Sequence, residues 1–207
     1  MNALARIISV IFHPLLMATY LFSLLAWALP SALAPLQPGS QPAYIVLVFI
    51  VTFLLPLSNI VIFRIFGTIR SFAMVERKER LIPFVFISAI YVAVTYLLYV
   101  KTGLGPDHNF LKLMIIIDLL VVVSTIATFF FKVSVHSVAI WGFVGITLLL
   151  TKIAEVNTLF YATIGLILLA GVVMSSRLQL AAHSSHEVML GGVLGLATSI
   201  AGMLILF

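Results

Sequence analysis

The sequence predicts an all-α protein that crosses a membrane as a bundle of six to seven transmembrane helices. Its 207 residues are 63% hydrophobic and only 8% charged, whereas soluble domains are about 45–50% apolar and about 25% charged. The apolar residues form long runs without the alternation of a membrane β-barrel, so helices are the elements left to cross the lipid. We expect residues 1–207 to form a single integral membrane domain.

Seven apolar runs follow one another along the chain, each of spanning or near-spanning length. A hydrocarbon core of roughly 30 Å takes about 20 helical residues. The fifth run is short for that thickness, so the count stays open between six and seven. The predicted runs lie at 7–29, 43–66, 81–100, 110–131, 137–151, 156–174 and 188–206.

Turn-forming or polar segments separate these runs. PSALAPLQPGSQP at 30–42 and KTGLGPDHN at 101–109 are rich in Pro and Gly, which favour turns, and TKIAEVN at 151–157 is a short polar connection. His13 precedes Pro14 inside the first run, and we expect it to bond to a carbonyl at a kink. That run has no clear small-residue cleavage site, so we interpret it as a retained span.

The remaining composition narrows the function classes. The chain has no cysteine, which excludes disulfides, thiolate metal sites and a catalytic thiol. Its formal charge of +5 comes from a few clustered Lys and Arg residues and does not indicate a surface for nucleic acid. Clustered carboxylates of the kind that hold Mg²⁺ are missing from the sequence, so we expect neither a metal nor a cofactor.

Three polar clusters emerge on the same membrane face if all seven runs span. The clusters are RIFGTIRSFAMVERKERLIP at 64–83, FKVSVHS at 131–137 and SSRLQLAAHSSHE at 175–187. Two spans separate each cluster from the next, and an even number of crossings returns the chain to the side it left. We therefore expect the three clusters to form one site.

The residue types in these clusters suit the chemistry of a phosphate. Gathered cations donate charge-assisted hydrogen bonds to its oxygens, and histidines supply a nucleophile and proton transfer near neutral pH. In a helix His183 and Glu187 would share a face, so the carboxylate can hold one imidazole N–H and leave the other nitrogen free. The candidate residues are Arg77, Lys78, Arg80, Lys132, Ser134, His136, Arg177, His183 and Glu187.

The last cluster carries a resemblance to a known family. SSRLQLAAHSSHE resembles the third motif of the type 2 phosphatidic acid phosphatase superfamily, S-R-x5-H-x3-D, with Ser176, Arg177 and His183 in register. Glu187 stands where the family has Asp, which keeps the carboxylate and lengthens its arm.

The middle cluster resembles the second motif of that family, P-S-G-H. In KVSVHS, Ser134 and His136 are in register, while Val133 and Val135 replace the Pro and the Gly.

The first cluster is similar to the first motif, K-x6-R-P, at fewer positions. Pro83 matches the motif proline, and Ile82 occupies the position of its arginine. The cations Arg77, Lys78 and Arg80 lie slightly upstream. The resemblance as a whole covers the region from about residue 70 to residue 207.

The resemblance implies a metal-independent hydrolase of lipid phosphates or diphosphates. It implies that His183 attacks phosphorus to form a phosphohistidine, that Glu187 orients it, and that His136 protonates the leaving oxygen. Arg177 and Ser134 would bind the phosphoryl oxygens, and Ser176 belongs to the same motif. The role of the first-motif cations would pass to Arg77, Lys78 or Arg80.

Two other function classes remain open from the sequence. A haem-binding electron-transfer bundle could use His136 and His183 as ligands from different spans. A lipid-handling or transport bundle without catalysis would also retain polar groups at a membrane face.

The partner we expect is a membrane lipid, in the cell membrane and most naturally the inner membrane of a bacterium. The positive-inside rule compares the Lys and Arg residues on the two membrane faces. Without the candidate phosphate ligands the numbers are equal: Arg6, Arg64 and Arg70 on the face of the clusters, and Lys101, Lys112 and Lys152 on the other. The resemblance implies an outward-facing site. A reporter placed after Phe207 would then lie in the cytoplasm.

Overall fold

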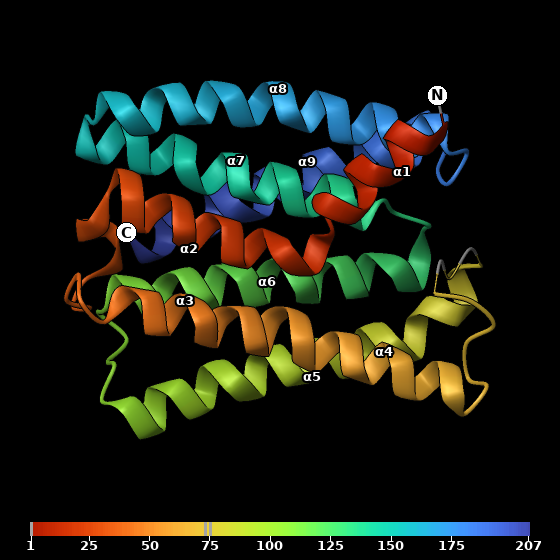
Figure 1. The fold of residues 1–207 in the computed structure, drawn as a ribbon, viewed down its shortest axis with the longest axis horizontal. Coiled ribbons are helices and arrows are strands. Elements are labelled where there is room, and N and C mark those ends of the chain that lie inside the picture. The colour runs from red at the N-terminus through yellow and green to blue at the C-terminus, as the bar shows by residue number, and fades with distance from the viewer. Residues whose placement is uncertain (1, 73, 75) are drawn as a thin grey trace.

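The computed structural model describes residues 2–72, 74 and 76–207, and every regular element within them is helical (Figure 1). Seven helical segments are long and apolar enough to cross a membrane, which confirms the all-α membrane bundle. The elements are α1 (Asn2–Ile11), η1 (Pro14–Leu16), α2 (Met17–Ala28), η2 (Pro30–Leu33), α3 (Gln41–Phe49), η3 (Ile50–Leu54), α4 (Leu55–Ile65), α5 (Arg77–Thr102), α6 (Asn109–Phe130), α7 (Val135–Ala154), α8 (Asn157–Gln179) and α9 (Ser185–Leu206).

The short fifth run belongs to a full-length helix. Helix α7 has 20 residues because its first turn begins in the polar segment before the run and its last turn extends to Ala154. Seven candidate spans, and not six, therefore make this a multi-pass membrane protein.

The first span is broken between α1 and α2. A residue before proline is driven toward extended backbone, and His13 has φ −64° and ψ 137°. Pro14 then starts the short helix η1, and the backbone N–H of Leu15 donates to Nδ1 of His13 at 3.3 Å. The expected kink is present. The prediction that His13 bonds to a carbonyl there is wrong for Nδ1, which accepts a hydrogen bond from the N–H of Leu15.

The second span contains a π-helical turn, η3, between α3 and α4. Pro56 has no N–H, so the carbonyl of Thr52 four residues earlier lacks its usual helical donor. The hydroxyl of Tyr91 in α5 donates to that carbonyl at 2.8 Å. The backbone oxygen is thus satisfied within the protein, as a bilayer interior requires, and the contact joins the second span to α5.

Helices α7 and α9 approach until their backbones nearly touch. A Cβ atom at Gly191 would lie 2.6 Å from the carbonyl oxygen of Ser134, and one at Gly195 would overlap the carbonyl of Val138. Glycines of the segment MLGGVLG therefore serve close helix packing, as expected for small residues in membrane bundles. This approach holds the start of α9 against the connection between α6 and α7.

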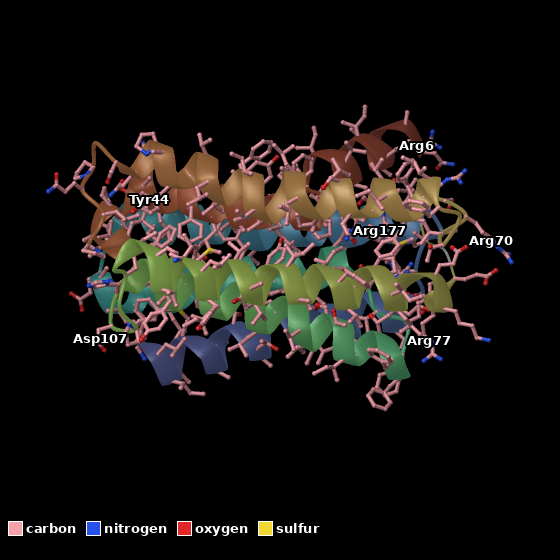
Figure 2. All side chains as sticks on the ribbon, turned by 90° about the horizontal axis from the view of Figure 1, so that it is seen from below. Arg6, Tyr44, Arg70, Arg77, Asp107 and Arg177 are labelled. Carbon is pink, nitrogen blue, oxygen red and sulfur yellow. The ribbon has the colours of Figure 1, made fainter. Side chains whose placement is uncertain are left out.

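The three predicted clusters do emerge at one end of the bundle, which we call the site face. It carries residues 66–72 and the connections 131–134 and 180–184, together with the N-terminal end of the described chain (Figure 1). Arg6, Arg70 and Arg77 lie toward this end, and Asp107 lies at the other end (Figure 2). The prediction from counting spans is confirmed.

Candidate functional site

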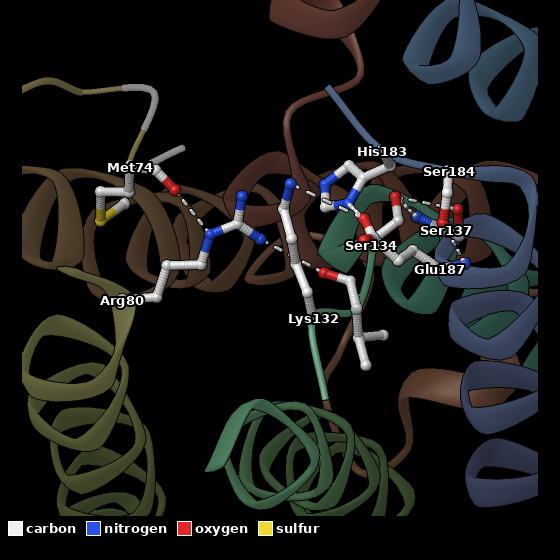
Figure 3. A network of polar contacts seen from close by, with 9 residues as sticks. Met74, Arg80, Lys132, Ser134, Ser137, His183, Ser184 and Glu187 are labelled. Atoms are coloured by element: carbon white, nitrogen blue, oxygen red, sulfur yellow. Dashed lines mark hydrogen bonds and ion pairs between the residues drawn. The ribbon is translucent and has the colours of Figure 1, made fainter. Parts of the chain in front are cut away.

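The centre of the site is a histidine–glutamate pair at the start of α9. Ser184 is the N-cap of α9, and its hydroxyl accepts the backbone N–H of Glu187 at 3.3 Å. His183 lies just before this cap, and its Nδ1 is 2.7 Å from Oε2 of Glu187 (Figure 3). The carboxylate accepts the proton on Nδ1, so Nε2 of a neutral ring keeps its lone pair.

The surroundings of His183 favour this neutral ring. Its side chain is only 3% exposed, and its pKa is lowered from 6.5 to about 4, chiefly by burial. The hydrogen bond to Glu187 opposes that shift, while the charges of Arg80 and Arg177 add to it. An imidazole with a free lone pair, subject to the charges of two guanidinium groups, can attack an anionic centre that those groups hold.

The connection between α6 and α7 forms the second part of the site. Nζ of Lys132 lies 3.8 Å from Oε2 of Glu187, and the backbone N–H of Ser134 donates to the Glu187 carbonyl at 3.2 Å. The fully buried hydroxyl of Ser134 caps α7, where it accepts from the backbone N–H of Ser137 at 3.4 Å and from its hydroxyl at 3.0 Å. Both contacts with Glu187 bring the second and third clusters together.

Arg80 connects the first cluster to the other two. It is buried in the first turn of α5, where Nε donates to the carbonyl of Met74 at 2.7 Å and one terminal nitrogen to the carbonyl of Val133 at 3.3 Å (Figure 3). A guanidinium has five N–H donors, so these two bonds leave donors for an anion. Its charge also lowers the pKa of His183.

Arg177 brings a second guanidinium from the last turn of α8. Within the part of the chain that the structure describes, its buried Nε has no hydrogen-bond partner. A buried cationic donor without a partner is costly, so an anion bound here would relieve that cost. The neighbouring hydroxyl of Ser176 donates to the Val173 carbonyl at 2.7 Å.

The other two first-cluster cations point elsewhere. Arg77 donates to the carbonyl of Phe129 at 2.6 Å, which ties the start of α5 to the end of α6. Lys78 is exposed at the site face. Of the three predicted cations, Arg80 is the one whose hydrogen bonds reach the connection that carries Lys132 and Ser134.

The first span contributes residues that the sequence did not indicate. Nε2 of His136 lies 3.0 Å from the carbonyl oxygen of Ser9 and donates to it, and the Ser9 hydroxyl is 3.2 Å from that of Ser176. The ring of His13 meets the His136 ring edge to face, with centroids 5.7 Å apart. The site therefore extends beyond the region from about residue 70 to 207, because α1 and η1 orient one of its histidines.

One local signal in the sequence could have located the start of α9. Ser184 and Glu187 have the S-x-x-E spacing of a capping box, which places the helix start after His183. The pair was expected within one helix, and the structure corrects this: His183 belongs to the preceding turn.

No protein-family model, curated protein or solved structure matches this chain. The fold and the site thus define its class on their own. It is a multi-pass helical membrane protein with a histidine–glutamate pair, a lysine and two arginines gathered at one face. Among the described residues, no three His, Asp or Glu side chains are arranged to hold a metal ion.

Proposed function

We propose that the protein is a membrane phosphatase that hydrolyses a lipid-linked phosphate or diphosphate through a phosphohistidine, without a metal. The observation that carries the proposal is the buried His183, bonded to Glu187 through Nδ1 and subject to the charges of Arg80 and Arg177. These groups supply a nucleophile, its orienting carboxylate and preorganised positive charge for the phosphoryl oxygens.

The reaction has two steps. Nε2 of His183 forms a bond to phosphorus while the P–O bond to the lipid oxygen breaks, and the departing oxygen takes up a proton. Glu187 keeps the proton on Nδ1 and stabilises the positive charge that develops on the ring. Water then attacks phosphorus and gives up a proton, which restores the proton donor of the first step; the N–P bond breaks, and inorganic phosphate leaves with His183 again neutral.

The family resemblance makes His136 the proton donor to the leaving oxygen. Its Nε2 bonds to the Ser9 carbonyl, so the transferred proton has to travel on Nδ1. The Ser134 hydroxyl accepts from Ser137, so its own O–H can donate to a phosphate without losing that bond. The Ser176 hydroxyl would have to exchange its bond to the Val173 carbonyl for one to phosphate.

The location of the site favours a lipid substrate. His183 and Lys132 lie in connections at the end of a bundle whose helices are apolar enough to span a membrane. A phosphate held there can keep its hydrocarbon part in the bilayer. The proposed location is the cell membrane, with the bacterial inner membrane and its outward face as the specific expectation.

The test is phosphate release by pure protein in mixed micelles of detergent and lipid, with excess chelator throughout. The substrates are phosphatidic acid, phosphatidylglycerophosphate and a polyprenyl diphosphate. We expect hydrolysis of at least one, abolished by His183→Ala and retained by His186→Ala. His186 is a matched control because it is exposed and lies three residues away.

Two results would reject this function. A strict requirement for Mg²⁺ would exclude the metal-free mechanism, and His183→Ala with near-normal activity would exclude the phosphohistidine. If no lipid phosphate is hydrolysed, the chain is better described as a lipid-handling or transport protein. A haem-binding protein would instead show a visible absorption spectrum after purification.

A further inference from the structure

The interior of the bundle contains a long cavity of about 100 Å³ between η1, α2, α5, α6 and α7. Its lining begins at Pro14 and Val135 near the site face and ends at Leu21 and Ile146. On α7 alone it extends from residue 135 to residue 146, which is about 16 Å at a rise of 1.5 Å per residue. The cavity is therefore a narrow slot parallel to the helices that reaches roughly half of the ~30 Å hydrocarbon core.

The walls of this cavity offer nothing polar to a ligand. Nearly all lining side chains are apolar, and the few hydroxyls bond to backbone. Ser124 donates to the Leu120 carbonyl at 2.7 Å and Thr125 to the Val121 carbonyl at 3.0 Å. The hydroxyl of Tyr91 donates to the backbone as well, at the Thr52 carbonyl in η3. A buried water needs two to four polar partners, so the slot suits an apolar occupant.

The upper end of the cavity lies beside the polar site. Pro14 directly follows His13, and Val135 lies between Ser134 and His136. The histidine rings at this end are 5.7 Å apart by centroid. A hydrocarbon chain in the slot would thus have its polar end beside the histidines.

We infer that this cavity binds one hydrocarbon chain of the substrate, so the substrate class is a lipid phosphate that inserts a single unbranched or prenyl chain between the helices. This inference rests on the proposed function for the identity of the head group. A volume of about 100 Å³ along about 16 Å of helix leaves room for one chain and not two, so any second chain of a diacyl lipid would stay in the bilayer.

A substitution that fills the cavity tests the inference through its effect on activity. Ala139 lines the slot one helical turn below Val135, so Ala139→Leu would place three additional carbons in it. The control is Ala89→Leu, the same change at an exposed position of α5. A buried methylene is worth about 0.8 kcal/mol, so we expect kcat/KM for a sixteen-carbon monoalkyl phosphate to fall about tenfold or more in Ala139→Leu.

A four-carbon alkyl phosphate is the internal reference in this comparison. Its chain is too short to reach the middle of the slot, so no buried methylene is displaced and its kcat/KM should change less than about twofold. Ala18→Val, on the α2 wall of the same cavity, is a second variant if Ala139→Leu lowers the thermal unfolding temperature. Equal kinetics of the cavity variants and Ala89→Leu on the long substrate would overturn the inference.

A binding test separates this inference from the proposed function. A sixteen-carbon alkyl phosphonate with a photoreactive group at mid-chain is irradiated with the His183→Ala protein, and the labelled peptides are mapped. We expect labels on α7 between residues 139 and 146 and on α2 near Leu21. Labels confined to exposed positions such as Leu168 of α8 would reject the cavity, even if the wild-type protein hydrolyses lipid phosphates. Labels in the cavity without any hydrolysis would support the chain site and reject the phosphatase.

Discussion

Glu187 contacts two site residues through one oxygen, since Oε2 lies 2.7 Å from Nδ1 of His183 and 3.8 Å from Nζ of Lys132. Glu187→Gln would remove the charge that stabilises the imidazolium and could present an amide N–H to the ring, which favours the wrong tautomer. We expect kcat to fall by about 10²- to 10⁴-fold, with a smaller loss in Glu187→Asp. Steady-state hydrolysis of one lipid phosphate by the three proteins measures this, and an unchanged rate in Glu187→Gln would contradict the orienting role.

The pKa of His183 predicts an unusual pH profile. The neutral ring is the nucleophile, and burial lowers its pKa to about 4, so activity should persist as the pH falls through 6.5 and decline near pH 4. The charges that act on His183 belong to Arg80 of α5, Arg177 of α8 and Glu187 of α9, and Glu187 in turn is paired with Lys132 of the α6–α7 connection. A profile of kcat/KM against pH checks this, and an acid limb centred at the ordinary histidine value of 6.5 would contradict it.

Single-residue features differ in how far the sequence predicted them. The contact between His183 and Glu187 was expected from their spacing within one helix; the structure contains the contact, with His183 in the turn before α9. The bond between His136 and Ser9 joins residues 127 positions apart, so no local pattern indicates it. The number of spans between the three clusters predicted that they share one face. Which carbonyl each polar side chain contacts is determined only by the packing of the helices.

At the scale of elements, the contact between α7 and α9 gives a stability prediction. Gly195→Val would push against the backbone of Val138, and overpacking of this kind costs about 1–3 kcal/mol. We expect a lower free energy of unfolding in detergent and weaker activity, because the start of α9 would move from the α6–α7 connection. The control is Gly171→Ala on α8, where an added Cβ meets nothing within 4 Å. That change should be neutral or stabilising by up to about 1 kcal/mol, and equal effects of both changes would contradict close packing.

The elements themselves were largely predictable. A long apolar run in lipid forms a helix, because its backbone groups must bond within the segment. Hydropathy therefore located all seven candidate spans. The irregular turns inside the first two spans were harder. Pro14 indicated the first break, and Pro56, which follows the π-helical turn at Ile50–Leu54, removes a helical donor there. The replacement donor, the Tyr91 hydroxyl, comes from another span and leaves no trace in the local pattern.

At the scale of the whole molecule, seven spans place the two ends of the chain on opposite sides. With the site facing outward, we expect a reporter after Phe207 to lie in the cytoplasm and a reporter inserted in the 66–72 connection to lie outside. Paired fusions that are active only in the cytoplasm or only outside it measure this. The reverse pattern would place the site in the cytoplasm, and the same side for both reporters would contradict seven spans.

The hydroxyls of Ser9 and Ser176 meet across 167 positions of sequence, and this has a consequence for biogenesis. Domains assemble as the chain is synthesised, with the N-terminal part first. The first span enters the membrane early, yet the Ser9 hydroxyl does not meet Ser176 until the hairpin of α8 and α9 arrives. A ribosome-bound chain that stops before that hairpin would hold a lipid slot but no nucleophile. The order of synthesis would thus keep a half-made protein from acting on the membrane that receives it.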